Sequence, residues 1–187
     1  MTNAFIIHGT GGRPGENWFL WLKKELEALD CKVFVPQFPT PQDQTPDAWF
    51  GIFEQHEKYF TQDTILIGHS LGGTFALRIL ESAKVRIKAA FIVAAPIGVL
   101  PIKNYETDKP FIGKPFDWEK IRENCARFFV FHSEDDPLVS VENGKELAKR
   151  LDAELILFKN AGHLNEKADY TKFEKLLEKI KEELKED

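Results

Sequence analysis

This chain of 187 residues has few of the features that mark a secreted, membrane-bound or nucleic-acid-binding protein. Its two cysteines, Cys31 and Cys125, have a spacing that fits neither a disulfide framework nor a metal site. The net charge is −5 and the basic residues form no stripe, which argues against a nucleic-acid partner. No apolar run approaches the length of a membrane span, and residues 1–8 lack the positively charged start of a signal peptide. We therefore expect a reduced, cytoplasmic protein with no membrane partner.

Hydrophobic residues make up 43% of the chain, which is enough for a single domain over residues 1–187 with a substantial core. Short apolar runs alternate with helical patterns. This alternation predicts a three-layer α/β fold, with a mostly parallel sheet of about six strands and helices on both faces. The expected strands are Ala4–His8, Lys32–Val35, Thr64–Gly68, Ala89–Ala94, Arg127–His132 and Glu154–Phe158. The expected helices are Glu16–Leu29, Pro46–Phe60, Leu71–Ser82, Val141–Leu151 and Ala168–Leu184.

The most informative motif is Gly68-His69-Ser70-Leu71-Gly72, a G-x-S-x-G pentapeptide between an apolar run and a helical pattern. A serine on a tight turn between a strand and a helix is typical of the nucleophile of an α/β-hydrolase. The two glycines are explained by the turn, because a Cβ at either position would crowd it. The alternative interpretation is an ordinary turn in which Ser70 caps the following helix.

A serine hydroxyl becomes a good nucleophile when an imidazole takes its proton and a carboxylate orients that imidazole. In α/β-hydrolases the chain order is serine, acid, histidine. His163, which follows an apolar strand and a glycine, is therefore the predicted base. Asp136, at the start of an Asp-Pro-x-Val sequence, is the predicted acid, and Asp135 stays open as the alternative. His132 precedes the acid, so we expect it to be structural.

The oxyanion of an acyl-transfer reaction needs two backbone N–H donors. Leu71, directly after the predicted nucleophile, should supply one. The second should come from the loop His8-Gly9-Thr10-Gly11-Gly12, with Thr10 as the expected donor and Gly9 or Gly11 as alternatives. This loop lacks the glycine spacing of a dinucleotide site, and no cofactor or metal is expected. We expect His8 and His69 to form hydrogen bonds behind the two donor loops without transferring protons.

Residues 97–120 interrupt the alternation with three prolines and several aromatic residues. We interpret this segment as a small lid or pocket wall, with Phe111 and Phe116 lining an apolar substrate pocket. Trp18, which follows the oxyanion loop, is a third candidate for that pocket. The alternative is a surface crossing whose aromatic side chains pack on the sheet.

Five short motifs together resemble those of a family of small serine hydrolases that includes the YdeN-like proteins and retinoblastoma-binding protein 9. They are His8-Gly9, Asn17-Trp18, the pentapeptide around Ser70, Asp135-Asp136-Pro137 and Gly162-His163. The resemblance covers nearly the whole chain. It implies a compact, nearly lid-free α/β-hydrolase with Ser70, Asp136 and His163 as its triad.

Retinoblastoma binding is attributed to an L-x-C-x-E motif, and this chain departs from it. The nearest match, Leu29-Asp30-Cys31-Lys32-Val33, has valine in place of glutamate. We therefore expect no retinoblastoma-type partner.

The expected activity is that of a serine hydrolase that cleaves small carboxylic esters through a covalent Ser70 acyl-enzyme, as a monomer or weak dimer. Its expected partner is a small-molecule ester or a related acyl substrate. Thioesterase or amidase/aminopeptidase activity on the same triad is one alternative. A protein-binding module that keeps the hydrolase fold without turnover is the other.

Overall fold

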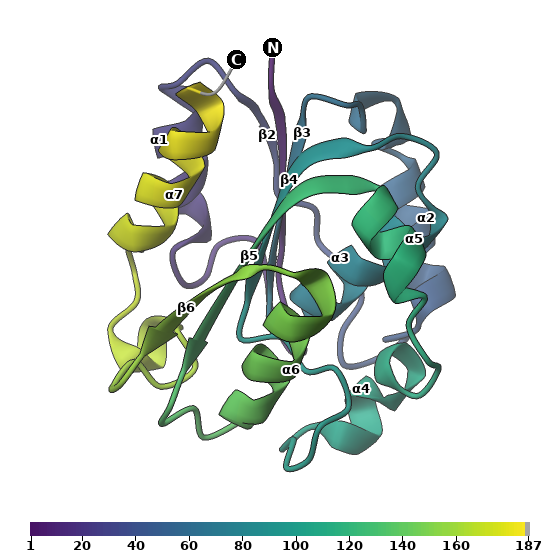
Figure 1. The fold of residues 1–187 in the computed structure, drawn as a ribbon, viewed down its shortest axis with the longest axis vertical. Helices are drawn as coiled ribbons and strands as arrows, with labels where there is room; N and C mark the ends of the chain where they lie inside the picture. Colours follow the sequence, from purple (N-terminus) through teal and green to yellow (C-terminus); the bar gives the residue numbers. More distant parts are fainter. Residues whose placement is uncertain (186–187) are drawn as a thin grey trace.

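The computed structural model describes residues 1–185, which form a parallel sheet between two layers of helices (Figure 1). The strands are β1 (Asn3–Ile7), β2 (Lys32–Phe34), β3 (Thr64–His69), β4 (Ile87–Val93), β5 (Cys125–Ser133) and β6 (Glu154–Phe158). The helices are α1 (Phe19–Glu27), α2 (Pro46–Glu54), α3 (Leu71–Ser82), α4 (Tyr105–Ile112), α5 (Trp118–Glu123), α6 (Val141–Leu151) and α7 (Glu174–Lys185). Short 3₁₀ turns lie at Glu57–Tyr59 and Glu166–Ala168.

All neighbouring strands in the sheet are parallel, in the order β2-β1-β3-β4-β5-β6. Strands β3 and β4 occupy the centre of the sheet, and every residue of β3 is buried. Because the strands are parallel, their carboxyl ends lie at one edge of the sheet, where ligands bind in open α/β folds. The predicted α/β class with helices on both faces is confirmed.

The two faces of the sheet carry separate cores, and side chains alternate between them along each strand. In β1, Phe5 and Ile7 join the core beneath α2, α3, α5 and α6. Ala4 and Ile6 point the other way, into the core beneath α1 and α7. This period of two is the expected geometry of a strand that is covered on both faces.

Three predicted helices differ from the structure at their ends. The helix expected from residue 16 begins at Phe19, since Asn17 has a left-handed backbone with φ of 52°. The helix expected to reach residue 60 ends at Glu54 and is followed by the first 3₁₀ turn. The last helix begins at Glu174 instead of residue 168, because Asp169, with φ of 64°, ends the second 3₁₀ turn.

The proline-rich segment 97–120 contains α4 and the start of α5. An isolated antiparallel bridge joins Ile102 to Val139, and the N–H of Lys103 donates to Leu138 O at 2.8 Å. The segment is therefore tied to the loop that follows β5. Helix α4 also packs against α3.

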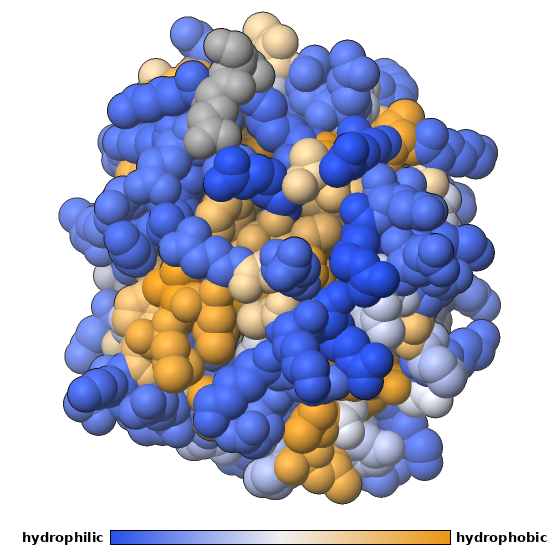
Figure 2. Space-filling model, viewed as in Figure 1, coloured by the Kyte–Doolittle hydropathy of each residue, from blue (hydrophilic) through white to orange (hydrophobic). Residues whose placement is uncertain are grey.

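Hydrophilic side chains cover most of the face shown in Figure 2. A hydrophobic area lies where Figure 1 places the edge strand β6, whose Leu157 is among the exposed large apolar residues. Within residues 1–185, no helix combines the length and the apolar character that a bilayer crossing requires.

Candidate active site

Ser70 lies on the turn between β3 and α3 in a strained backbone conformation, with φ of 55° and ψ of −127°. Its N–H donates to Val93 O at 2.8 Å, which ties the turn to the neighbouring strand β4. A Cβ at Gly68 would collide with the backbone of Gly72, and one at Gly72 would collide with the backbone of Ile7. The two glycines of the motif are thus required by close packing, and the turn directs Ser70 into a cavity at the carboxyl edge of the sheet.

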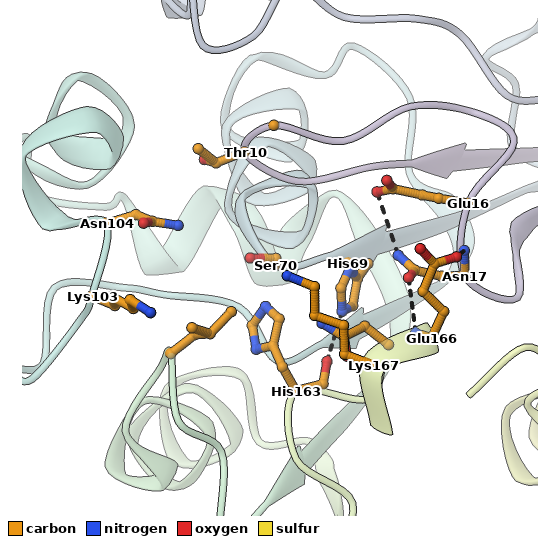
Figure 3. Close-up of a pocket in the computed structure, with 13 residues that line it drawn as sticks. Thr10, Glu16, Asn17, His69, Ser70, Lys103, Asn104, His163, Glu166 and Lys167 are labelled. Carbon is orange, nitrogen blue, oxygen red and sulfur yellow. Dashed lines mark hydrogen bonds between the residues drawn. The ribbon is translucent and has the colours of Figure 1, made fainter. Parts of the chain in front are cut away.

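His163 and Asp136 form a buried pair beside this serine. His163 Nδ1–H donates to Asp136 Oδ2 at 2.8 Å. In a neutral ring with this tautomer, Nε2 is the nitrogen that carries no proton. The other oxygen of Asp136 accepts from the N–H groups of Leu138 and Val139, at 2.8 and 3.1 Å. These bonds hold the carboxylate in place. Figure 3 shows Ser70 and His163 at the wall of the same cavity.

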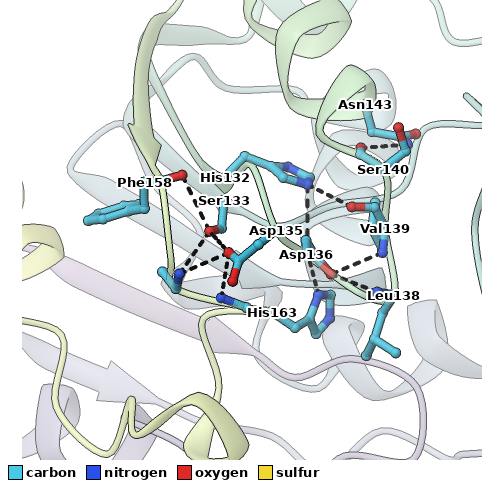
Figure 4. A network of polar contacts seen from close by, with 12 residues as sticks. His132, Ser133, Asp135, Asp136, Leu138, Val139, Ser140, Asn143, Phe158 and His163 are labelled. Carbon is cyan, nitrogen blue, oxygen red and sulfur yellow. Dashed lines mark hydrogen bonds and ion pairs between the residues drawn. The ribbon is translucent and has the colours of Figure 1, made fainter.

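Asp135, the alternative acid, points away from His163 (Figure 4). Its Oδ1 accepts from Ser133 Oγ at 2.5 Å and from the N–H groups of Ala161 and Gly162, each at 3.0 Å. The hydrogen bond from Ser133 is the main reason why the pKa of Asp135 is lowered. Asp135 therefore anchors the turn that leads into His163. No local pattern indicated this role, because Ala161 and Gly162 lie 26 and 27 positions further along the chain.

The geometry of the two donor loops narrows the choice of the second oxyanion donor. Gly11 N–H donates to Thr40 Oγ1 at 2.6 Å, and Gly12 N–H donates to Gly9 O at 3.0 Å. Within residues 1–185, the N–H groups of Thr10 and Gly9 have no such acceptor, so Gly11 is disfavoured while Thr10 and the alternative Gly9 both stay open. Leu71 is the first residue of α3, where a backbone N–H has no partner inside the helix.

Three further histidines, His8, His69 and His132, are buried around the site. His8 Nδ1–H donates to Gly9 O at 2.9 Å, and its Nε2 accepts from Phe38 N–H at 3.0 Å. His69 Nε2–H donates to the carbonyl of His163 at 2.9 Å. Burial lowers the pKa of His8, and it lowers the pKa of His69 to about 3. Both rings are therefore neutral hydrogen-bonding groups behind the loops.

His132 contacts the acid from the side opposite His163. Its Nε2–H donates to Val139 O at 3.0 Å and lies 3.6 Å from Asp136 Oδ2 (Figure 4). Burial lowers the pKa of His132. From its position at the end of a buried strand we predicted that His132 is structural. Its proximity to Asp136 was not predicted.

The cavity next to Ser70 has a volume of about 310 Å³ and a strongly polar wall. Besides Thr10, Gly11, His69, Ser70 and His163, the wall consists of Glu16, Asn17, Lys103, Asn104, Leu138, Asn165, Glu166 and Lys167. Figure 3 shows Lys103 and Asn104 on one side, with Glu16, Asn17 and Glu166 on the other. Two hydrogen bonds join the segments of Asn17 and Glu166. Asn17 N–H donates to Glu166 Oε2 at 3.2 Å, and Glu166 N–H donates to Asn17 Oδ1 at 3.0 Å.

The three aromatic residues predicted for the pocket do not line this cavity. Trp18 is fully buried between α1 and α7, and its Nε1–H donates to Leu164 O at 3.0 Å. Phe111 is fully buried in the other core, against Trp49. Phe116 packs beneath the guanidinium of Arg78, with the ring centroid 3.8 Å from Cζ. These aromatic side chains pack against other parts of the protein, and the wall of the cavity beside Ser70 is mostly polar.

No group of three or more histidine, cysteine, aspartate or glutamate side chains among residues 1–185 is placed to hold a metal ion. A buried aspartate–histidine pair, beside a serine on a strained turn at the carboxyl edge of a parallel sheet, is the arrangement found in α/β-hydrolases.

Comparison with known proteins narrows this class. The family model described as "Serine hydrolase" matches residues 4–182, and the chain belongs to this family. It is 32% identical to Serine hydrolase RBBP9 of Rattus norvegicus over 183 residues, covering 96% of this chain and 94% of that protein. It is 29% identical to the putative hydrolase YdeN of Bacillus subtilis, covering 90% and 88%. The crystal structure of YdeN superposes with a TM-score of 0.92 at 25% identity, over 98% of this chain and 99% of YdeN.

Proposed function

We propose that this protein hydrolyses small carboxylic esters, with Ser70 as nucleophile, His163 as general base and acid, and Asp136 as the acid of the triad. The observation that carries the proposal is the 2.8 Å bond between His163 Nδ1 and Asp136 Oδ2, beside a cavity that Ser70 and His163 both line. With Nδ1 protonated, Nε2 of His163 is the nitrogen available to accept a proton.

The reaction takes place in two acyl-transfer steps. His163 Nε2 accepts the proton of Ser70 Oγ while Oγ attacks the ester carbonyl carbon, and the N–H groups of Thr10 and Leu71 stabilise the oxyanion. His163 then gives this proton to the departing alkoxide, which leaves as an alcohol, and the acyl group stays on Ser70. In the second step, water loses a proton to His163 and attacks the acyl-enzyme. The carboxylic acid leaves and Ser70 regains its proton, while Asp136 stabilises the imidazolium each time it forms.

Amide substrates with a free amine are the second candidate, because two carboxylates line the cavity. Glu16 and Glu166 lie on the same side of it, and their mutual repulsion adds to burial in raising the pKa of Glu16. A substrate ammonium group between them would relieve this repulsion. This would give an amidase or aminopeptidase on the same triad.

Labelling with a fluorophosphonate probe, read by intact mass with Ser70→Ala as control, tests the shared mechanism. One adduct on the wild type and none on the variant is the expected result. Rates on matched esters, thioesters and aminoacyl amides of one acyl group then rank the substrate classes. No adduct on folded wild-type protein would contradict the proposal and favour a binding module without turnover.

A further inference from the structure

A carboxylate that the proposed reaction does not use is buried beneath the oxyanion loop. Asp108, on α4, has an exposed fraction of 2%. Its Oδ1 accepts from Thr10 Oγ1 at 2.5 Å and from Gln44 Nε2 at 3.2 Å. Burying a carboxylate is costly unless it is hydrogen-bonded, so this group is held by specific donors. The contact joins α4 to a loop that is 98 residues away in sequence.

The same hydrogen bonds continue to the other side of the loop. Gln44 Nε2 also donates to Thr10 Oγ1 and to Thr107 O, each at 3.1 Å. Gln44 Oε1 accepts from Thr40 Oγ1 at 2.5 Å, and Thr40 Oγ1 accepts from Gly11 N–H at 2.6 Å. Thr10 is thus held through its hydroxyl, and the next peptide is held through its N–H.

These hydrogen bonds bear on the orientation of the Thr10 N–H, which belongs to the peptide group just before the anchored side chain. The loop contains Gly9, Gly11 and Gly12, and Gly11 has φ of 70°, so its backbone alone would permit other peptide orientations. Oxyanion stabilisation depends on donors that are already oriented before charge develops. The Thr10 N–H, which has no acceptor among residues 1–185, lies directly before the anchored hydroxyl and the anchored Gly11 N–H. Gly9 O, on the same peptide group as the Thr10 N–H, accepts from Gly12 N–H at 3.0 Å and from His8 Nδ1–H at 2.9 Å, so this peptide group is held as well.

We infer that Asp108, Gln44 and Thr40 are positioning residues that orient the Thr10 N–H toward the oxyanion. The inference rests on the proposed function. It also gives a role to α4, since the segment after β4 then holds the oxyanion loop by hydrogen bonds instead of lining an apolar pocket.

The matched variants Thr10→Val and Thr10→Ser test this role. Valine keeps the shape of threonine but removes the hydroxyl that Asp108 holds, whereas serine keeps the hydroxyl. With a small activated ester, we expect Thr10→Val to lower kcat about 10-fold, less than the loss on removing an oxyanion donor outright. KM should change less than about 2-fold, and Thr10→Ser should recover most of the lost kcat. Asp108→Asn should lower kcat in the same direction, and Glu106→Gln, at an exposed position of the same helix, should leave kcat unchanged.

Each kcat is divided by the active fraction, counted as fluorophosphonate adducts on intact protein, so that partial unfolding does not count as lost catalysis. A Thr10→Val protein with wild-type kcat and a lower Tm would overturn the inference, because the contact would then only attach α4 to the rest of the fold. Equal losses in the serine and valine variants would also overturn it. If wild type accepted no adduct and hydrolysed no ester, the proposed function itself would fail, which is a different result from normal turnover in Thr10→Val.

Discussion

Acid should destabilise this protein through His69, whose imidazole is buried and neutral in the folded state. Burial is the main cause that lowers the pKa of His69 from 6.5 to about 3, and the nearby His163 adds to it. In the unfolded chain the same ring has its ordinary pKa of about 6.5. Between these two values the unfolded state binds one more proton than the folded state. The stability is therefore complete above the unfolded pKa and is lost as the pH falls toward the folded one.

The size of this effect follows from the width of that interval. One proton of difference changes the free energy of unfolding by about 1.4 kcal/mol per pH unit. An interval of roughly 3.5 pH units therefore corresponds to a loss of about 5 kcal/mol. A decrease from about pH 6 to about pH 4 already removes about 2.5 kcal/mol. This is a large share of the roughly 5–15 kcal/mol that stabilises a typical domain.

The variant His69→Gln keeps an N–H group for the carbonyl of His163 but removes the titration. Urea unfolding across about pH 4 to 7, followed by tryptophan fluorescence, should give a wild-type slope that is steeper by about 1.3 kcal/mol per pH unit below about pH 5.5, with a smaller difference near pH 7. His8 and His132 titrate in both proteins, so their contributions cancel in the difference. His56→Gln, a change at a half-buried histidine elsewhere, is the control and should keep the wild-type slope. Equal slopes for the wild type and His69→Gln would refute the reasoning.

Four further substitutions test the site and the core. Asp136→Asn should lower kcat by about 10³- to 10⁴-fold in an ester assay, because an amide favours the wrong tautomer of His163. Asp135→Asn should mainly lower Tm, since it weakens the turn before His163, and equal kcat losses in the two variants would contradict these assignments. Gly72→Ala should lower the urea-unfolding free energy by at least about 2 kcal/mol, because its Cβ meets the backbone of β1; wild-type stability would contradict the packing argument. Phe111→Ala should cost about 3–5 kcal/mol in the same assay, with an unchanged KM for a small ester; a KM shifted several-fold would instead place the ring at the substrate.

Much of the fold could be predicted from local patterns. A β-strand covered on both faces needs a nearly continuous apolar run, and such a run located the buried strand β3 to within a residue. A short apolar run also located the edge strand β6, although its side chains are only partly buried. Helices α3 and α6 begin and end at the predicted residues, since Ser70 and Ser140 mark their starts. The ends of α1, α2 and α7 were wrong, because left-handed residues and 3₁₀ turns interrupt otherwise helical patterns.

The sequence by itself determined the strands and the glycine-bounded turn at Ser70, because each depends on residues adjacent along the chain. The order of the candidate triad, serine before acid before histidine, can also be seen directly in the sequence. Only the tertiary structure decided which residues line the cavity, since its wall comes from separate segments around Glu16, Lys103 and Glu166. Composition shows that Phe111 is hydrophobic but not whether a core or a ligand buries it. The bonds from Thr10 to Asp108 and from His69 to His163 join residues 98 and 94 positions apart. Such contacts depend on how the layers pack, so no local pattern in the sequence contains them.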